Sequence, residues 1–280
     1  MKQQFFLFIS LLLCAVYFTA CTSESYNVDS VKAEDTSAAN NKTTTNSLGA
    51  VSSIKGKTFA VKTPPFFVLS VGANYNIGIS ETSENFSPDQ FEGGLNFGVK
   101  NGFGVSATGK FALDKKTGNL RLILHGAYNH FSSNTSGTFK YNILSFGPGL
   151  ENSFTPRFSV KPFIGGALLG SMISGSADYT INGTETNITI KNSFRLGFMF
   201  YAGLEYALSD HVGVNIGAKI TNANTWLKST KDDQNGNEIG LRDAFSSPQL
   251  TYGGWKNFAY TSFFGGISFY FGVKNKLYKF

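Results

Sequence analysis

Apolar and polar residues alternate with a period of two along two adjacent segments, residues 194–208 and 212–221. Such alternation is typical of β-strands that have one apolar face. Residues 209–211 separate the two segments and are expected to form a tight turn. Each segment is long enough for the roughly 9–11 residues with which a tilted strand crosses a bilayer, whereas ordinary strands have about 5–6 residues. The two segments therefore predict a membrane-spanning β-hairpin.

The polar face of this hairpin consists mostly of Gly, Asn, Ser and Thr, with charges only at Arg195, Glu205 and Lys219. A sheet of this length that faced water would carry more charges. We interpret the polar face as the lining of a narrow, packed lumen, and the apolar face as the surface in contact with lipid.

The same alternation predicts eight strands. Their expected ranges are 66–80, 95–113, 120–131, 138–154, 159–174, 194–208, 212–221 and 258–272. In the second strand, Phe97 and Val99 are expected to share the outward face with Phe103. In the fourth strand the apolar residues change phase near Ile143 and Leu144, and the fifth is apolar on both faces, so the pattern leaves the register of both open.

The predicted connections alternate in length. Short ones follow strands two, four and six, at residues 114–119, 155–158 and 209–211. Longer ones follow strands one, three, five and seven, at residues 81–94, 132–137, 175–192 and 229–257. Short turns on one rim and longer loops on the other are typical of outer-membrane barrels, and an even strand number puts both termini on the short-turn side. The sequence therefore predicts an all-β fold, an eight-stranded antiparallel up-and-down transmembrane β-barrel.

Composition agrees with this class. The chain has 280 residues, of which 31 are Gly and only 15% are charged, against a usual charged fraction of about 25%. It has no apolar run of about 18 residues, which excludes membrane-spanning helices. Both cysteines lie within the first 21 residues and the three histidines are scattered, so we expect no disulfide, metal or cofactor. No basic cluster is interleaved with aromatic residues, so nucleic acid is not an expected partner.

The N-terminal part has a different composition. Residues 1–20 have the pattern of a secretory signal peptide. Residues 18–21 resemble a bacterial lipoprotein box, although Phe18 stands where that family prefers Leu; the resemblance implies that Cys21 is lipidated and becomes the mature N-terminus. The alternative is that Cys21 is an ordinary residue of the signal region. Residues 21–60 are rich in Ser, Thr and Asn and predict a disordered tether, which leaves residues 61–280 for the barrel.

The strand sequences resemble those of small bacterial outer-membrane β-barrel proteins of the eight-stranded, OmpA/OmpX-like type. The resemblance covers about residues 64–273 and is carried by Gly-and-aromatic strands, above all Tyr201–Tyr206 and Phe263–Gly272. It implies an outer-membrane location, with outer-membrane lipids and the barrel-assembly machinery as partners. That machinery would read the aromatic final strand, with either Phe271 or the terminal Phe280 as the signal. The resemblance implies fold and location rather than a biochemical activity.

Lys110, Arg121 and Glu205 are expected near the same rim of the lumen. Charges in so narrow a barrel must pair, because a lone buried charge costs several kcal/mol. We expect the three residues to form a buried cluster that fills the lumen, since the interior of an eight-stranded barrel is just wide enough for side chains. The alternative is an ion pathway.

His130 and Ser132 are similar to the His-x-Ser pairing of outer-membrane lipid A deacylases. A period of two places both on one face, as a base beside a nucleophile requires. The following strand offers Lys140 rather than a carboxylate to orient the histidine, so we assign no catalytic residue. Both residues are then polar residues at the membrane interface and the loop.

The predicted loops 175–192 and 229–257 form the expected recognition surface, for partners that the sequence does not name. Asp232, Asp233 and Asn235 suggest calcium, but the other ligands of a calcium loop are absent, and we expect a solvated loop. The expected function is non-enzymatic: an integral outer-membrane barrel, anchored as a lipoprotein, with a role in envelope structure or surface contact. The alternatives are a lipid A deacylase-like enzyme and a soluble, lipocalin-like carrier of an apolar ligand.

Overall fold

A computed structural model describes residues 58–82, 97–114, 117–133, 138–154, 160–181, 183–229, 237–245, 254–273 and 275–279. The predicted signal peptide, Cys21 and nearly all of the predicted tether lie outside these residues. So do the predicted turn 155–158, the terminal Phe280 and the three residues that suggest calcium.

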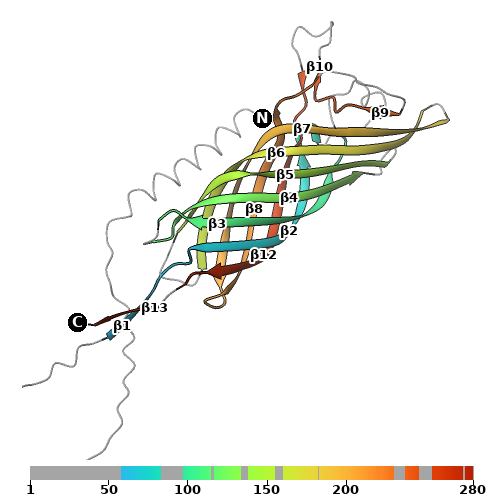
Figure 1. The fold of residues 1–280 in the computed structure, drawn as a ribbon. Coiled ribbons are helices and arrows are strands. Elements are labelled where there is room, and N and C mark those ends of the chain that lie inside the picture. Colours follow the sequence, from blue (N-terminus) through green and yellow to red (C-terminus); the bar gives the residue numbers. More distant parts are fainter. Residues whose placement is uncertain are drawn as a thin grey trace, which may run out of the picture. The chain divides into compact units, whose positions relative to one another are not determined.

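Eight long strands form a closed barrel (Figure 1). They are β2 (Phe67–Ile79), β3 (Asn101–Ala112), β4 (Leu120–Ser133), β5 (Thr138–Ser153), β6 (Val160–Ile181), β7 (Thr184–Ala207), β8 (Val212–Trp226) and β12 (Ala259–Phe271). Each pairs antiparallel with the next, and β12 closes the barrel against β2, from Ala259 opposite Ile79 to Phe271 opposite Phe67. The predicted fold class is confirmed. The described helical structure is the short 3-10 turn η1 (Ser80–Thr82), and no described helix is suited to crossing a membrane.

The period-two alternation of the sequence becomes an alternation of burial. In β4, Leu122, Leu124 and Tyr128 are exposed on the outside, whereas Arg121 and His125 are buried inside. The other strands repeat this arrangement, so large apolar side chains cover the exterior. An apolar exterior on a closed antiparallel barrel is the arrangement that lipid requires, because strand pairing all the way round the wall leaves no open sheet edge.

The prediction for the second strand was wrong at its start. The strand begins at Asn101, and Phe97 and Val99 precede it with exposed fractions of 1% and 0%, whereas Phe103 is 68% exposed. Gly98 adopts a positive φ of 68°, a conformation that favours glycine. The segment is held inward because Val99 N–H donates to the Thr82 carbonyl.

The apparent phase change in the fourth predicted strand does not occur. In β5, burial alternates through the whole strand, with Tyr141 and Ile143 inside and Leu144 and Phe146 outside. Apolar residues occur on both faces because the interior itself is apolar near this end of the barrel. The interpretation of the lumen as lined by Gly, Asn, Ser and Thr therefore does not extend to this end of the barrel.

The predicted loop 175–192 was also wrong. β6 continues to Ile181 and β7 begins at Thr184, and the two pair as far as Ile181 opposite Thr184. The intervening Asn-Gly sequence is typical of two-residue hairpin turns, and Gly183 has a positive φ of 80°. The hairpin of β6 and β7 extends beyond the neighbouring strands (Figure 1). We call this part, Thr180–Asn187, the hairpin extension.

Short strands occupy the described parts of the predicted loop 229–257. β9 (Glu238–Ile239) pairs in parallel with β7, and β10 (Ala244–Phe245) pairs with β11 (Gly254–Trp255). Separately, β1 (Thr58–Lys62) and β13 (Asn275–Lys279) form a two-stranded sheet that the sequence pattern did not predict.

Candidate functional site

Lys110, on β3, lies between two buried glutamates. Its Nζ is 2.8 Å from a carboxylate oxygen of Glu151 on β5 and 4.0 Å from one of Glu205 on β7. Arg121, on β4, approaches the same Glu151 at 3.9 Å, and its Nε donates to the Gly118 carbonyl at 3.1 Å. The structure thus brings together the three residues singled out in the sequence, Lys110, Arg121 and Glu205, with Glu151 as a fourth. We call these four residues the ion cluster.

Sequence reasoning missed Glu151 because the register of its strand was left open. In the structure Glu151 pairs with Arg121 across the β4–β5 ladder, which puts both on the inner face. The Tyr201 hydroxyl donates to Glu151 at 3.0 Å, and the Ser268 hydroxyl donates to Glu205 at 3.2 Å. Each carboxylate therefore has a cation as ion-pair partner and a neutral hydrogen-bond donor, as buried charges require.

Neutral polar side chains also bridge the lumen. Asn76 donates to Asn129 at 2.9 Å, and Asn129 donates in turn to the Tyr260 hydroxyl at 3.2 Å. The hydroxyls of Ser70 and Ser268 bond at 2.9 Å. Ser70 and Ser268 are opposite each other on the neighbouring strands β2 and β12, whereas the bond between Asn129 and Tyr260 joins β4 to β12, which are not neighbours in the wall.

An aromatic layer fills the end of the lumen away from the ion cluster. It consists of Phe97, Phe131, Tyr141, Phe258 and Tyr260, whose rings pack at centroid distances from 4.8 to 6.4 Å. All five side chains are buried. Edge-to-face and tilted packing at such distances is favourable for aromatic pairs. The layer closes the lumen where the sequence led us to expect small polar residues.

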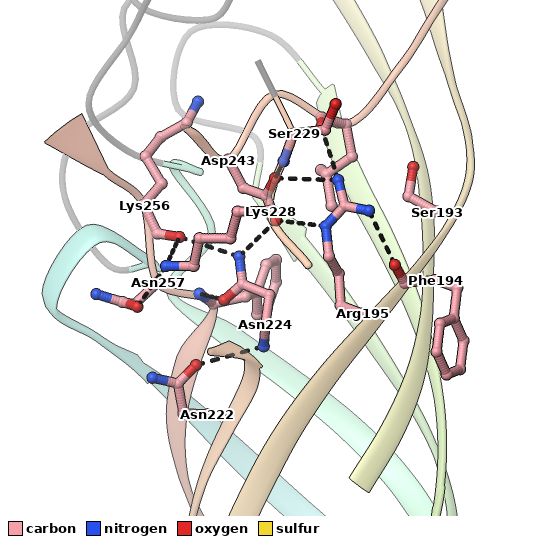
Figure 2. Close-up of polar contacts among 12 residues, drawn as sticks. Ser193, Phe194, Arg195, Asn222, Asn224, Lys228, Ser229, Asp243, Lys256 and Asn257 are labelled. Atoms are coloured by element: carbon pink, nitrogen blue, oxygen red, sulfur yellow. Dashed lines mark hydrogen bonds and ion pairs between the residues drawn. The ribbon is translucent and has the colours of Figure 1, made fainter. Parts of the chain in front are cut away.

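Above this layer, a polar cluster fastens the segment after β8 to the barrel (Figure 2). The Arg195 guanidinium donates to both oxygens of Asp243, from Nε at 2.6 Å and from Nη2 at 3.0 Å. Asn224 donates to Asp243 at 3.0 Å and accepts from Phe258 N–H at 2.6 Å. Asn224 lies where β8 bulges, because Trp226 pairs with Leu196 but Asn222 pairs with Phe198. We call Arg195, Asn224 and Asp243 the latch.

Two lysines extend the latch. Lys228 Nζ donates to the Lys256 carbonyl at 2.9 Å and to the Asn257 side chain at 2.7 Å. Lys256 Nζ lies 5.2 Å from the centre of the Phe97 ring. Burial lowers the pKa of Lys256 to about 8, with the nearby Asp243 opposing the shift and Arg242 adding to it. The expectation that 229–257 is a solvated loop was therefore wrong for Leu241, Asp243 and Lys256, which are buried, whereas Glu238 and Trp255 are exposed.

His130 and Ser132 lie on the outer face of β4. His130 Nδ1 donates to the Asn142 side-chain oxygen at 2.8 Å, and the Tyr128 hydroxyl donates to the same oxygen at 2.8 Å. Ser132 is opposite Lys140 in the β4–β5 ladder. These contacts do not orient His130 as a base toward Ser132. Among the described residues, no cluster of His, Cys, Asp and Glu could hold a metal ion.

The lumen contains a cavity of about 50 Å³ between the ion cluster and β8. A site for an apolar small molecule usually has roughly 300–1,000 Å³. The cavity is therefore too small for the cargo of a carrier, and the exposed apolar exterior also differs from the surface of a soluble protein.

These features define a fold class: a closed eight-stranded antiparallel wall, an apolar exterior and a filled interior make up the fold of small outer-membrane β-barrel proteins of OmpA/OmpX type. No protein-family model and no curated protein matches the sequence.

Several solved structures are similar in fold. Neisserial surface protein A (NspA) has a TM-score of 0.43 and 14% identity, over 76% of this chain and 99% of that one. Ail, the attachment invasion locus protein of Yersinia pestis, has a TM-score of 0.38 and 10% identity, over 73% and 96% of the chains. The N-terminal barrel domain of Pseudomonas aeruginosa OprF has a TM-score of 0.33 and 12% identity, over 74% and 99%. At these values the class rests on the geometry of the barrel itself.

Proposed function

We propose that this chain is a non-enzymatic, non-conducting protein of the bacterial outer membrane that acts in surface contact through the hairpin extension of β6 and β7. The observation that carries the proposal is the combination of a filled lumen with a strand pair that outreaches the rest of the wall. The ion cluster fills one end of the lumen and the aromatic layer fills the other. Such a barrel has no route for solutes. Contact with partners is then left to the end of the barrel that carries the long connections.

The orientation follows from the connections. The β7–β8 turn is short, and Leu208 and Ser209 N–H both donate to the Val212 carbonyl across it. Short turns of outer-membrane barrels face the periplasm and long connections face outward. The hairpin extension and the latch then lie outside the cell. A lipid on Cys21 would hold the predicted tether on the periplasmic side, and this anchoring is part of the proposal.

Cysteine labelling on intact cells tests this orientation. Glu185→Cys places a thiol in the hairpin extension, and Ser209→Cys places one in the β7–β8 turn; both native residues are exposed. A membrane-impermeant maleimide should label Glu185→Cys on intact cells, and Ser209→Cys only after the outer membrane is permeabilised. The unmutated chain controls for Cys14 and Cys21. Labelling of Ser209→Cys but not of Glu185→Cys on intact cells would reverse the orientation and exclude surface contact by the hairpin.

The closed lumen is tested by conductance. Full-length protein in a planar lipid bilayer should give no discrete channel steps, because side chains occupy the lumen at both ends. A constant single-channel conductance that disappears when the protein is omitted would contradict the proposal and favour an ion pathway.

A further inference from the structure

Lys219, on β8, is a buried lysine that points into the lumen. Its side chain is 5% exposed, and it lines the cavity of about 50 Å³ together with His125, Thr108 and Phe264. Among the described residues, the Lys219 ammonium group has no ion pair and no hydrogen-bond partner. A buried charge without a partner costs several kcal/mol, so this arrangement requires compensation.

The carboxylates of the barrel are already engaged. Glu151 and Glu205 belong to the ion cluster, where they serve Lys110 and Arg121. Asp243 serves Arg195 in the latch. In total, five buried Lys and Arg side chains face three buried carboxylates within the described residues. The excess is two: Lys256, which lies over the Phe97 ring outside the wall and near Asp243, and Lys219, which lies on β8 within the wall.

Hydrogen-bond donors on neutral side chains near Lys219 also lack partners among the described residues. Ser262 lies opposite Lys219 in the β8–β12 ladder, and its buried hydroxyl has no partner in the described part of the chain. Opposite residues on one face of a sheet have Cβ atoms about 4.5–5.5 Å apart, so both groups can reach a common ligand. The Asn74 side chain accepts from Ser106, which lines the cavity, while its own buried Nδ2 has no partner among the same residues.

The other charged groups of the lining, Lys110 and Glu151, are paired with each other at 2.8 Å, so the Glu151 carboxylate does not neutralise Lys219. The Thr108 hydroxyl bonds to His125 Nδ1 at 2.8 Å, which leaves the opposite ring nitrogen of His125 available to a ligand. Phe163 and Phe264 form the apolar part of the lining. A water molecule needs a cavity of roughly 10–15 Å³. The cavity of about 50 Å³ therefore holds an ion with a water beside it but not an organic metabolite.

We propose that this cavity is a binding site for a small monovalent inorganic anion of the size of chloride, held by the ammonium group of Lys219 and by neighbouring neutral donors. The anion completes the charge balance of the lumen that the protein's own carboxylates leave open. It is thus a structural ligand of the barrel. The inference is independent of what the hairpin extension contacts.

Thermal unfolding of the full-length protein in detergent tests the site. The unfolding midpoint is measured by heat-modifiable gel mobility in sodium chloride, sodium bromide and sodium gluconate at equal ionic strength. A ligand that binds only the folded state raises the midpoint in proportion to the logarithm of its concentration. We expect higher midpoints in chloride and bromide than in gluconate, which is too large for the cavity.

Two variants separate the site from general salt effects. Lys219→Met should abolish the difference between chloride and gluconate, whereas Lys140→Met should keep it, because Lys140 is exposed on the outer face of β5. Equal midpoints of the wild type in all three salts would overturn the proposal. So would a Lys219→Met variant that keeps the full difference.

Crystals of the wild-type protein grown in bromide give a readout that does not depend on any variant folding. We expect an anomalous difference peak in the lumen beside Lys219 Nζ. A cavity without such a peak would overturn the proposal and would mean that water alone fills it.

Discussion

Lys110 and Glu151 form an ion pair inside the lumen with Nζ and a carboxylate oxygen 2.8 Å apart, and their side chains are 4% and 0% exposed. They come from β3 and β5, with β4 between them, so the pair ties together three strands of the wall. Removal of one partner from a buried pair leaves an uncompensated charge and typically costs about 3–5 kcal/mol.

Neutralising one member of this pair should therefore destabilise the barrel strongly. We expect Glu151→Gln or Lys110→Met to lower the free energy of unfolding by about 3–5 kcal/mol, and the double variant to lose less than the sum. The free energies of unfolding of the wild type, the two single variants and the double variant are measured by reversible urea unfolding in lipid vesicles. Lys140→Met, which removes an exposed lysine, is the control and should change stability little. Additive losses in the double variant would show that the two side chains do not act as a pair.

The latch should hold the segment after β8 without being needed for the barrel itself. Asp243→Asn removes the charge that pairs with Arg195 at 2.6 Å, and we expect faster protease cleavage within residues 237–258 while the barrel keeps its heat-modifiable mobility. The matched control is Glu238→Gln, because Glu238 is exposed and forms a surface ion pair with Lys191 at 3.7 Å. Surface pairs contribute about 0–1 kcal/mol, so this control should be cleaved at the wild-type rate. Equal cleavage of the two variants would refute a latch.

The buried Lys256 should make the stability of this region depend on pH. Its pKa falls from 10.5 to about 8 in the folded protein, so between these values the unfolded chain holds a proton that the folded chain has released. Stability therefore rises as pH increases from about 8 to 10.5 and is reduced at lower pH. The gain should be on the order of 3 kcal/mol, at about 1.4 kcal/mol for each pKa unit.

Comparison with Lys256→Met isolates this contribution, because other lysines and tyrosines titrate in both proteins. The Lys256→Met variant should have a higher unfolding midpoint than the wild type at pH 7. This difference should shrink as the pH approaches 10.5. A difference that stays constant over this range would show that Lys256 keeps its ordinary pKa in the folded protein.

We expect His130 to have no role in the deacylation of lipid A. Its ring bonds to Asn142 on the outer face, and Ser132 lies opposite Lys140. We expect isolated membranes that contain His130→Ala or the wild type to show the same lipid A acylation, measured by mass spectrometry. Acyl-chain release that the wild type performs and His130→Ala does not would restore the enzyme interpretation.

The alternation of apolar and polar residues in the sequence was sufficient to predict the wall of the barrel. Residues such as Leu204 and Ile216 recur every second position, so strand number and facing could be read directly. The same alternation misled where the interior is apolar, because Tyr141 and Ile143 look like lipid-facing residues although they pack inside. It also failed in the hairpin extension, whose many Thr and Asn residues resemble a loop although they form strands.

Partners in the lumen and latch could be predicted only in part. Lys110, Arg121 and Glu205 were found because charges are rare on the inner face, whereas Glu151 required the register of β5. Asp243 is 48 residues from Arg195 and lies in a segment without periodicity, so no spacing in the sequence connects them. Such contacts arise from the closure of the barrel and are visible only in three dimensions.

Fluorescence quenching by brominated phospholipid measures most directly which face of the barrel wall contacts lipid. In a Trp226→Phe, Trp255→Phe background, a single tryptophan replaces either Phe200, which is 53% exposed on the outside of β7, or Phe163, which is 4% exposed inside β6. We expect acyl-chain bromines to quench the tryptophan at 200 strongly and the one at 163 weakly. Equal quenching at the two positions, or stronger quenching at 163, would contradict an exterior that faces lipid.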